Sequence, residues 1–213
     1  MIEVAAGAAR WTITINRPEK ANALTAQMLA ELDAAIAGAQ SAGARVLVIT
    51  GKGPVFSAGA DLNEARNGTL TTDPIWEQVS GRIAGFPGLT ICALNGTCAG
   101  GALGMMLASD LRVAVDGAKV FYPVVKNGFL PQPSDPSRMA ALIGQGRAKM
   151  ILLGGAKIET REALAWGLFD RVVRAEAMAE AIDALSADAM DATPALLGAI
   201  KGMFRRVASV GKG

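Results

Sequence analysis

The residues that could do chemistry are concentrated in one stretch, Asn95 to Asp110, which reads NGTCAGGALGMMLASD. Its glycines and other small side chains would let a ligand lie directly against the backbone. A helix that begins near Gly101 would direct unpaired N–H groups and the positive end of its dipole at that ligand. This arrangement suits a carbonyl whose oxygen becomes negative during a reaction. The alternative is close packing of a helix on a strand, for which the same glycines would also serve.

The side chains available for proton transfer are restricted, because the chain of 213 residues contains no histidine. This excludes a Ser-His-Asp triad, a Cys-His pair and the imidazole ligands of most zinc sites. Proton transfer would have to use Asp, Glu, Tyr, Lys or water. Cys98 precedes the glycines and would be a nucleophile at a helix N-terminus, but packing is the better interpretation without a histidine partner. The spacing of Cys92 and Cys98 predicts neither a disulfide framework nor a metal site.

The composition is that of one domain with a sizeable core, at 51% hydrophobic and 19% charged residues. A net charge of +2 gives no indication of nucleic-acid binding. The sequence has neither the pattern of a signal peptide nor an apolar run of the roughly 20 residues that a membrane span needs. We therefore expect a soluble protein of the cytoplasm.

The elements that would position these residues alternate along the first part of the chain. Residues 45–50 and 90–94 are short apolar runs of the kind found in buried parallel strands, and each leads into a loop of small residues. Residues 111–115 and 119–121 are predicted to form a hairpin around Asp116-Gly117. Helical patterns follow at residues 138–153, 160–166, 175–189 and 194–207. The order of elements predicts an α/β core with a helical C-terminal part.

Five segments, taken together, resemble the enoyl-CoA hydratase/isomerase family, the crotonases. They are NRPEKANAL (16–24), FSAGADL (56–62), NGTCAGGALGMMLASDLRVA (95–114), the spacing of Pro123, Gly128 and Pro131, and GRAKMILLGGAKIETREALAWGLFDRVV (146–173). The resemblance implies a crotonase-like spiral of ββα units over residues 1–173. It also implies that residues 174–213 form a shortened helical trimerisation segment, so that the protein would be a homotrimer or a hexamer built from two trimers.

The same resemblance implies an acyl-CoA thioester as ligand, with coenzyme A as part of the substrate and no other cofactor. The thioester oxygen would lie in an oxyanion hole formed by the backbone N–H groups at Ala60 and Gly101. The positions that would contact coenzyme A and the acyl group are Lys20, Ala21, Ala58, Gly59, Ala60, Asp61, Leu62, Gly100, Gly101 and Tyr122.

Several charged residues have two interpretations. Arg17, Lys20 and Lys52 would supply positive charge near the phosphates of coenzyme A, or they would be solvated surface charges. Asp61 would accept a hydrogen bond from the adenine amino group, or it would cap the helix that follows. The basic face formed by Lys201, Arg205 and Arg206 would approach the phosphates from a neighbouring subunit, or it would be solvated.

The chain departs from the family where hydratases carry their two glutamates, since these positions are Gly104 and Val124. Water addition needs a base for water and an acid for the α-carbon, so the sequence does not predict ordinary hydratase activity. Asp135 is a candidate acid or base because other branches of the family carry an aspartate beyond the glycine that matches Gly128. Its alternative role is a turn before a proline. Glu64 is a weaker candidate, which would have to reach inward from the next turn.

We therefore expect an enzyme of the enoyl-CoA hydratase/isomerase type, a lyase or isomerase of CoA thioesters in fatty acid metabolism. The alternative is a catalytically inactive acyl-CoA-binding or assembly protein that keeps the fold. A nucleotide-binding protein of another fold is disfavoured because neither GxGxxG nor GxxxxGK[ST] occurs.

Overall fold

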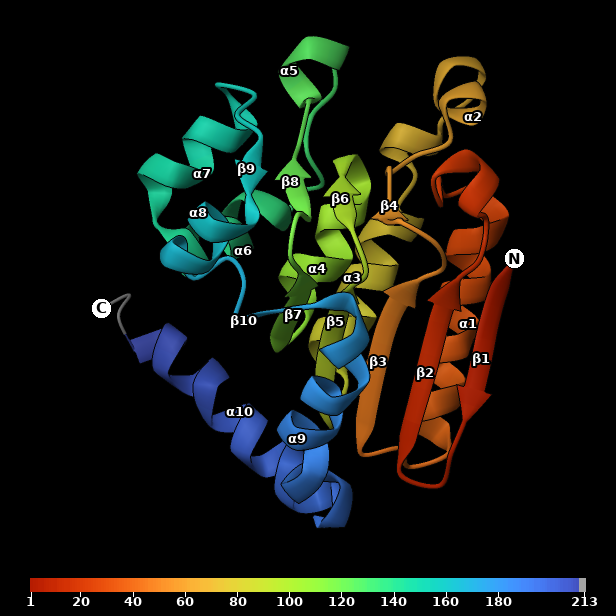
Figure 1. Ribbon diagram of the computed structural model, residues 1–213, viewed down its shortest axis with the longest axis vertical. Coiled ribbons are helices and arrows are strands. Elements are labelled where there is room, and N and C mark those ends of the chain that lie inside the picture. Colours follow the sequence, from red (N-terminus) through yellow and green to blue (C-terminus); the bar gives the residue numbers. More distant parts are fainter. Residues whose placement is uncertain (211–213) are drawn as a thin grey trace.

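Two sheets form the framework of the protein (Figure 1). The computed structural model describes residues 1–210, without the side chains of residue 67 and residues 205–210. Within these residues the larger sheet has six strands, in the order β1 (Ile2–Ala6), β2 (Arg10–Ile15), β3 (Val46–Gly51), β5 (Leu89–Leu94), β7 (Leu111–Val115) and β10 (Arg171–Val173). The smaller sheet has the order β4 (Val55–Ser57), β6 (Thr97–Ala99), β8 (Lys119–Phe121) and β9 (Ile158–Glu159).

The chain alternates between the two sheets, and this alternation produces the ββα spiral. β3, β5 and β7 lie in the larger sheet, and each is followed by a strand of the smaller sheet and then by helices. The neighbours β2, β3, β5, β7 and β10 pair in parallel, whereas β1 is antiparallel to β2. The helices are α1 (Ala26–Ser41), α2 (Leu62–Asn67), α3 (Ile75–Gly85), α4 (Leu103–Ala108), α5 (Val124–Asn127), α6 (Asp135–Ile143), α7 (Gln145–Leu152), α8 (Thr160–Trp166), α9 (Met178–Asp191) and α10 (Pro194–Val210).

The hairpin predicted around Asp116-Gly117 is wrong. β7 pairs in parallel with β5 and β10, while β8 pairs with β6 and β9 of the other sheet. Gly117 has a φ of 82°. The turn therefore carries the chain from one sheet into the other, and each strand finds its partners among strands that are distant in the sequence.

The central strands β3, β5 and β7 of the larger sheet are largely buried, as the continuous apolar run at residues 45–50 predicts. Alternate residues of β3 point to opposite faces. Leu47 and Ile49 belong to the main core with α1 and α3, whereas Val46 and Val48 pack in a second cluster with Ala189 of α9. Helix α9 thus covers the second face of the sheet within the same chain.

Helix α10 follows α9 and passes beside the residues that precede β5 and β7 (Figure 1). Near its middle, Lys201 Nζ donates hydrogen bonds to Asp110 Oδ2 over 2.7 Å and to the carbonyl oxygen of Gly88 over 3.2 Å. The basic face predicted for this helix is therefore anchored by Lys201 within the chain, while the side chains of Arg205 and Arg206 lie outside the described residues.

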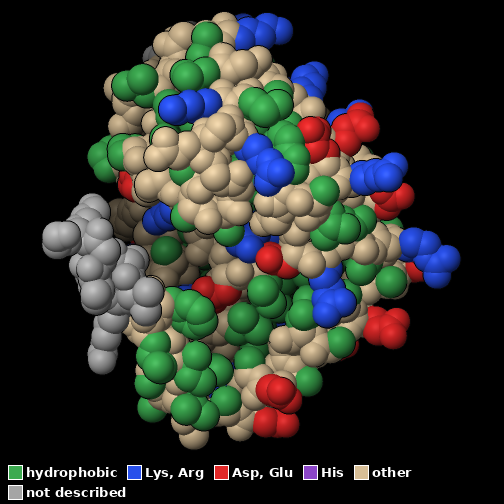
Figure 2. Space-filling model, turned by 90° about the vertical axis from the view of Figure 1, so that its left-hand side faces the viewer, with side chains coloured by type: hydrophobic (Ala, Val, Ile, Leu, Met, Phe, Trp, Pro, Cys, Tyr) green, Lys and Arg blue, Asp and Glu red, His purple; other side chains and the backbone are tan. Residues whose placement is uncertain are grey.

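Apolar side chains are exposed on α10, namely those of Leu196, Ile200, Met203 and Phe204. Figure 2 shows hydrophobic side chains gathered at the lower end of the face that carries α9 and α10. Among the described residues, no helix combines the length and the apolar character that crossing a membrane requires.

Candidate active site

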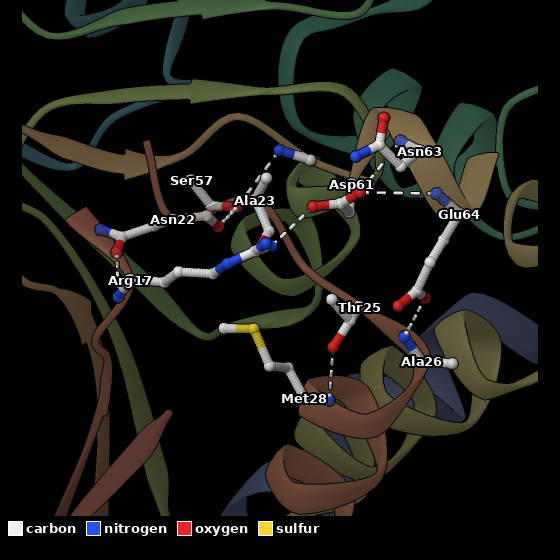
Figure 3. Close-up of polar contacts among 11 residues, drawn as sticks. Arg17, Asn22, Ala23, Thr25, Ala26, Met28, Ser57, Asp61, Asn63 and Glu64 are labelled. Atoms are coloured by element: carbon white, nitrogen blue, oxygen red, sulfur yellow. Dashed lines mark hydrogen bonds and ion pairs between the residues drawn. The ribbon is translucent and has the colours of Figure 1, made fainter. Parts of the chain in front are cut away.

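The loop before α1 is held against the loop after β3 by the buried side chain of Asn22 (Figure 3). Its Oδ1 accepts from the Arg17 amide over 2.8 Å, and its Nδ2 donates to the carbonyl oxygens of Lys52 and Val55. Asn22 and the preceding Ala21 have φ values of 54° and 50°, a left-handed conformation that asparagine tolerates better than most residues. The side-chain amide therefore fixes a sharp turn in the first loop.

This turn brings together residues predicted to contact coenzyme A. The Ala58 amide donates to the carbonyl oxygen of Ala21 over 3.0 Å, and the Ser57 hydroxyl donates to the carbonyl oxygen of Asn22 over 2.8 Å. Further along, Leu24 and Ala60 form a parallel bridge. In this bridge the Leu24 amide donates to the Gly59 carbonyl and the Asp61 amide donates to the Leu24 carbonyl, so the Ala60 N–H points the other way.

The loop at residues 58–60 contacts the glycine stretch backbone to backbone. A Cβ added at Gly59 would lie 2.8 Å from the carbonyl oxygen of Ala99 and 3.0 Å from the Gly101 nitrogen, and the φ of Gly59 is 91°. Only glycine fits such a position. Neither the Ala60 amide nor the Gly101 amide has an acceptor among the residues that the structure describes.

Both of these residues line the same cavity, which has a volume of about 100 Å³. Its wall includes six of the predicted contact positions: Ala58, Ala60, Leu62, Gly100, Gly101 and Tyr122. In the described part of the chain no Asp or Glu side chain lies in this wall. The cavity can therefore present backbone amides to a ligand, but any carboxylate must act from behind the wall.

The sequence analysis missed the aromatic and apolar walls of the cavity, which are formed by Trp76, Phe129 and Leu130. Trp76 is 4% exposed, and its Nε1 donates to the carbonyl oxygen of Leu70 over 2.8 Å. A Cβ added at Gly101 would lie 3.0 Å from the Trp76 ring. No periodicity in the sequence of α3 indicates that Trp76 contacts the glycine stretch. For Phe129 and Leu130 the sequence did offer an indication, because an apolar pair in a proline-rich loop is typical of a loop that packs over a cavity.

Asp135 lies at the first position of α6 with no exposed surface. Its Oδ2 accepts a hydrogen bond from the Tyr122 hydroxyl over 3.0 Å, and its Oδ1 is buried without a partner in the described residues. Burial raises the pKa of this carboxyl to about 7, against the opposing effects of the Tyr122 hydrogen bond and the charge of Arg138. The Asp135 amide does close a turn onto the Gln132 carbonyl, but the side chain takes no part in it.

The two positions that carry glutamates in hydratases lie close to this carboxylate or to the cavity. Val124 lies in the cavity wall. A Cβ added at Gly104 would lie 3.2 Å from Asp135 Oδ1. The structure therefore brings Asp135, Tyr122 and Gly104 together.

Glu64 is not brought to this site. Its Oε2 accepts from the Ala26 amide over 2.9 Å at the start of α1, and its side chain lies outside the cavity wall (Figure 3). A carboxylate at this position satisfies an N-terminal amide of the helix, beside the cap that Thr25 Oγ1 provides for Met28.

Asp61 caps α2, which is the second of the two interpretations above. Its Oδ1 accepts from the amides of Asn63 and Glu64, and its Oδ2 accepts from Arg17 over 2.7 Å. The hydrogen bond from Arg17, together with those from the two amides, holds the pKa of Asp61 below its ordinary value. Arg17 is therefore paired within the chain through its Nη1, which also donates to the carbonyl oxygen of Ala23.

The remaining charged candidates lie at the surface. Lys20 ends a short 3₁₀ helix (Pro18–Lys20) and is exposed, as is Lys52. Lys52 Nζ lies 3.9 Å from Glu3 Oε1.

Cys98 is fully buried, and burial raises the pKa of its thiol well above the ordinary value, which favours packing over nucleophilic chemistry. No cluster of metal-ligating side chains occurs in the described residues.

Comparison with known proteins places this geometry in context. The sequence profile of the enoyl-CoA hydratase/isomerase family matches residues 6–212. The chain is 35% identical over 187 residues to the putative enoyl-CoA hydratase/isomerase YngF of Bacillus subtilis, which covers 81% of this chain and 71% of that protein. Among solved structures, Pseudomonas aeruginosa DspI matches with a TM-score of 0.88 at 30% identity, covering 98% of this chain and 81% of that one. An enoyl-CoA hydratase/carnithine racemase from Magnetospirillum magneticum matches with a TM-score of 0.90 at 25% identity, covering 97% and 80%.

Proposed function

Since this chain belongs to the enoyl-CoA hydratase/isomerase family, we propose that it binds an acyl-CoA thioester and stabilises the negative charge that develops on the thioester oxygen. The N–H groups of Ala60 and Gly101 are the proposed donors. The observation that carries this proposal is that both residues line one cavity while their amides have no acceptor in the described part of the chain. One such donor is worth roughly 3 kcal/mol of transition-state stabilisation in comparable sites.

Coenzyme A itself would lie across the first loop and the start of α2. Lys20 and Ala21 come from the first loop, and residues 58–62 come from the segment that is hydrogen-bonded to it. In this arrangement coenzyme A enters as part of the substrate and no other cofactor takes part. The exposed amine of Lys20 is the charge best placed at the surface for a phosphate, because Arg17 is paired with Asp61.

The proposed reaction uses one carboxylate. Gly104 and Val124 cannot transfer protons, so the two-glutamate addition of water is not supported. A single base can instead move a double bond. Asp135 would take a proton from the α-carbon of a 3-enoyl thioester, the negative charge would pass to the thioester oxygen, and the same proton would return at the γ-carbon. Protons and electrons balance without a second acid.

Deuterium exchange tests this function directly. The protein would be incubated with butyryl-CoA in D₂O, and α-deuteration would be followed by mass spectrometry, with conversion of a 3-enoyl-CoA to the conjugated 2-enoyl-CoA followed by absorbance. We expect exchange in the wild type and a loss of at least 100-fold in Asp135→Asn. Exchange that persists unchanged in Asp135→Asn would contradict the assignment of the base.

The second candidate is an acyl-CoA-binding protein without catalytic activity, and the absence of acidic side chains at Gly104 and Val124 favours it. Calorimetric titration separates the two. Tight butyryl-CoA binding without exchange or isomerisation would support the binding protein over the enzyme.

We also propose a homotrimer or hexamer assembled through residues 174–213, in the cytoplasm and without nucleic-acid or membrane partners. The exposed apolar residues of α10 support an interface between subunits. Sedimentation equilibrium of the whole chain tests the number of subunits.

A further inference from the structure

The Asp135 carboxylate has one engaged oxygen and one that has no partner. Oδ2 is bound by the Tyr122 hydroxyl, while Oδ1 is buried without a partner in the part of the chain that the structure describes. A buried polar atom without a hydrogen bond costs free energy, and such atoms are rare in native proteins. Oδ1 is therefore the atom that is available for a proton or a ligand.

Tyr122 fixes which oxygen is engaged. Its hydroxyl accepts from the Gln132 amide over 3.3 Å and donates to Asp135 Oδ2 over 3.0 Å. Because the hydroxyl has only one proton, the amide that it accepts from directs that proton to Asp135. Tyr122 also lies in the cavity wall, so the carboxylate is held directly behind the wall.

Gly104 provides the space into which Oδ1 projects. A Cβ at residue 104 would lie 3.2 Å from Oδ1 and 3.7 Å from Oδ2, so any side chain there would compete with the carboxylate. Residues three apart in a helix share a face. Gly104 follows Gly101 by three residues in a continuous helical stretch, so the free oxygen lies on the side of the helix that carries the cavity-lining amide.

We propose that Tyr122 and Gly104 are positioning residues that together present Asp135 Oδ1 to the acyl group. The carboxylate comes from α6 and works in the space that a side chain at residue 104 would occupy. This inference rests on the proposed function, since it names the parts that make Asp135 competent in that reaction.

The other groups that face Asp135 are consistent with a carboxyl that ionises near neutral pH. Glu77 on α3 opposes ionisation by its charge and is itself bound by the Ser134 amide and hydroxyl. Arg138 on α6 favours ionisation from a distance while it donates to Ser80 Oγ. The Cys98 thiol on β6 is buried and neutral. The Tyr122 hydroxyl is the group in direct contact, so its removal should change the pKa of Asp135 most.

The first experiment is the substitution Tyr122→Phe, which keeps the ring and removes the hydroxyl. The Asp135 carboxyl would be titrated by carbon-13 NMR with labelled aspartate, using Asp135→Asn to assign the signal. Because the lost hydrogen bond favours the ionised form, we expect the pKa to rise by about one unit. The acidic limb of the exchange-rate profile should move upward by the same amount. A merely structural role would lower the thermal stability and leave the pKa unmoved.

The second experiment is Gly104→Ala, with Gly146→Ala as the matched control. Both glycines are helical, but a Cβ at Gly146 meets nothing within 4 Å. We expect Gly104→Ala to slow exchange at least tenfold with unchanged butyryl-CoA affinity, and Gly146→Ala to leave exchange unchanged. In urea unfolding, the destabilisation caused by Gly104→Ala should shrink when Asp135→Ala is also present, because the two sites share one volume.

The outcomes separate this inference from the proposed function. A wild-type protein without exchange would overturn the proposed function. An unmoved Asp135 pKa in Tyr122→Phe, or additive effects of Gly104→Ala and Asp135→Ala, would overturn the positioning roles alone. Complete loss of exchange in Tyr122→Phe at every pH, with an unmoved pKa, would mean that the hydroxyl itself transfers the proton and would also overturn them.

Discussion

The guanidinium of Arg17 and the carboxylate of Asp61 form an ion pair over 2.7 Å, which joins the first loop to the start of α2. Both side chains are largely buried. Arg17 also donates to the carbonyl oxygen of Ala23. One guanidinium therefore contacts both the first loop and the start of α2, the two segments proposed to hold coenzyme A. Arg17, which the sequence analysis gave as a possible phosphate contact, thus stabilises the conformation of the first loop.

We expect Asp61→Asn to destabilise the protein by on the order of 1–3 kcal/mol at pH 7, because the ion pair with Arg17 is lost. The asparagine side chain can still cap α2, so the cap itself should not contribute to the loss. The folded pKa of Asp61 is lowered, so its stabilising contribution is present above the unfolded pKa and is lost as the pH falls below about 4. Urea unfolding at pH 7 and pH 3 measures this. The wild type should lose more stability than Asp61→Asn over that interval, and an equal loss would contradict the pairing.

Asp135 should affect stability in the opposite direction. Its pKa is raised from 3.8 to about 7, so the folded protein holds this proton where the unfolded chain has released it. The associated stability is complete below about pH 4 and is lost as the pH rises to about 7, by on the order of 4 kcal/mol. We expect Asp135→Asn to remove this loss between pH 4 and pH 8 in urea unfolding. A pH dependence identical to that of the wild type would show that Asp135 is not a buried carboxyl of raised pKa.

Glu64→Gln should separate the two acidic candidates. Glu64 accepts from the Ala26 amide at the start of α1, and a glutamine oxygen can still accept from it. We therefore expect Glu64→Gln to lose less than about 1 kcal/mol of stability, from the lost negative charge near the helix N-terminus, and to keep an exchange rate within twofold of the wild type. Butyryl-CoA exchange assayed beside Asp135→Asn gives the comparison. A collapse of exchange in Glu64→Gln would place the base at Glu64 instead.

Trp76 should limit the length of the acyl group. The cavity volume of about 100 Å³ is smaller than the roughly 150 Å³ that accommodates benzene in an engineered cavity. We expect Trp76→Leu to raise the kcat/KM for hexanoyl-CoA exchange relative to butyryl-CoA exchange by about tenfold, while it lowers stability by about 2–4 kcal/mol. An unchanged ratio would mean that the acyl group does not lie against Trp76.

The fold could be predicted from the sequence wherever a local pattern determines it. The apolar runs at residues 45–50 and 90–94 are strands of the larger sheet, and the crotonase architecture inferred from five motifs is confirmed. The long helix expected over residues 138–153 is instead two helices, because Gly144 has a φ of 81° and ends α6. The hairpin failed because a turn with a positive-φ glycine does not by itself determine the partners of its two strands.

The site could be predicted only where backbone and spacing define it. Ala60 and Gly101 lie in one cavity as the motifs implied, whereas the role of Trp76 depends on how α3 packs and has no signature in the sequence. Gly104 and Asp135 are 31 positions apart in the sequence. The sequence therefore shows that residue 104 has no side chain and that residue 135 has a carboxylate, but it does not show that the two are neighbours. The predicted domain boundary at residue 173 and the oligomeric state stay predictions.

The close approach of Gly59 to the Gly101 nitrogen separates the parts of this site that substitutions can change from the part that they leave in place. The corner that would receive the carbonyl is made of main chain, whereas the surrounding walls are made of side chains such as Trp76, Phe129 and Leu130. Substitutions in the walls can therefore alter which acyl group is accepted without moving the two amides. Preference for a new acyl group could thus be gained stepwise, while the main-chain corner proposed to stabilise the charge keeps its geometry.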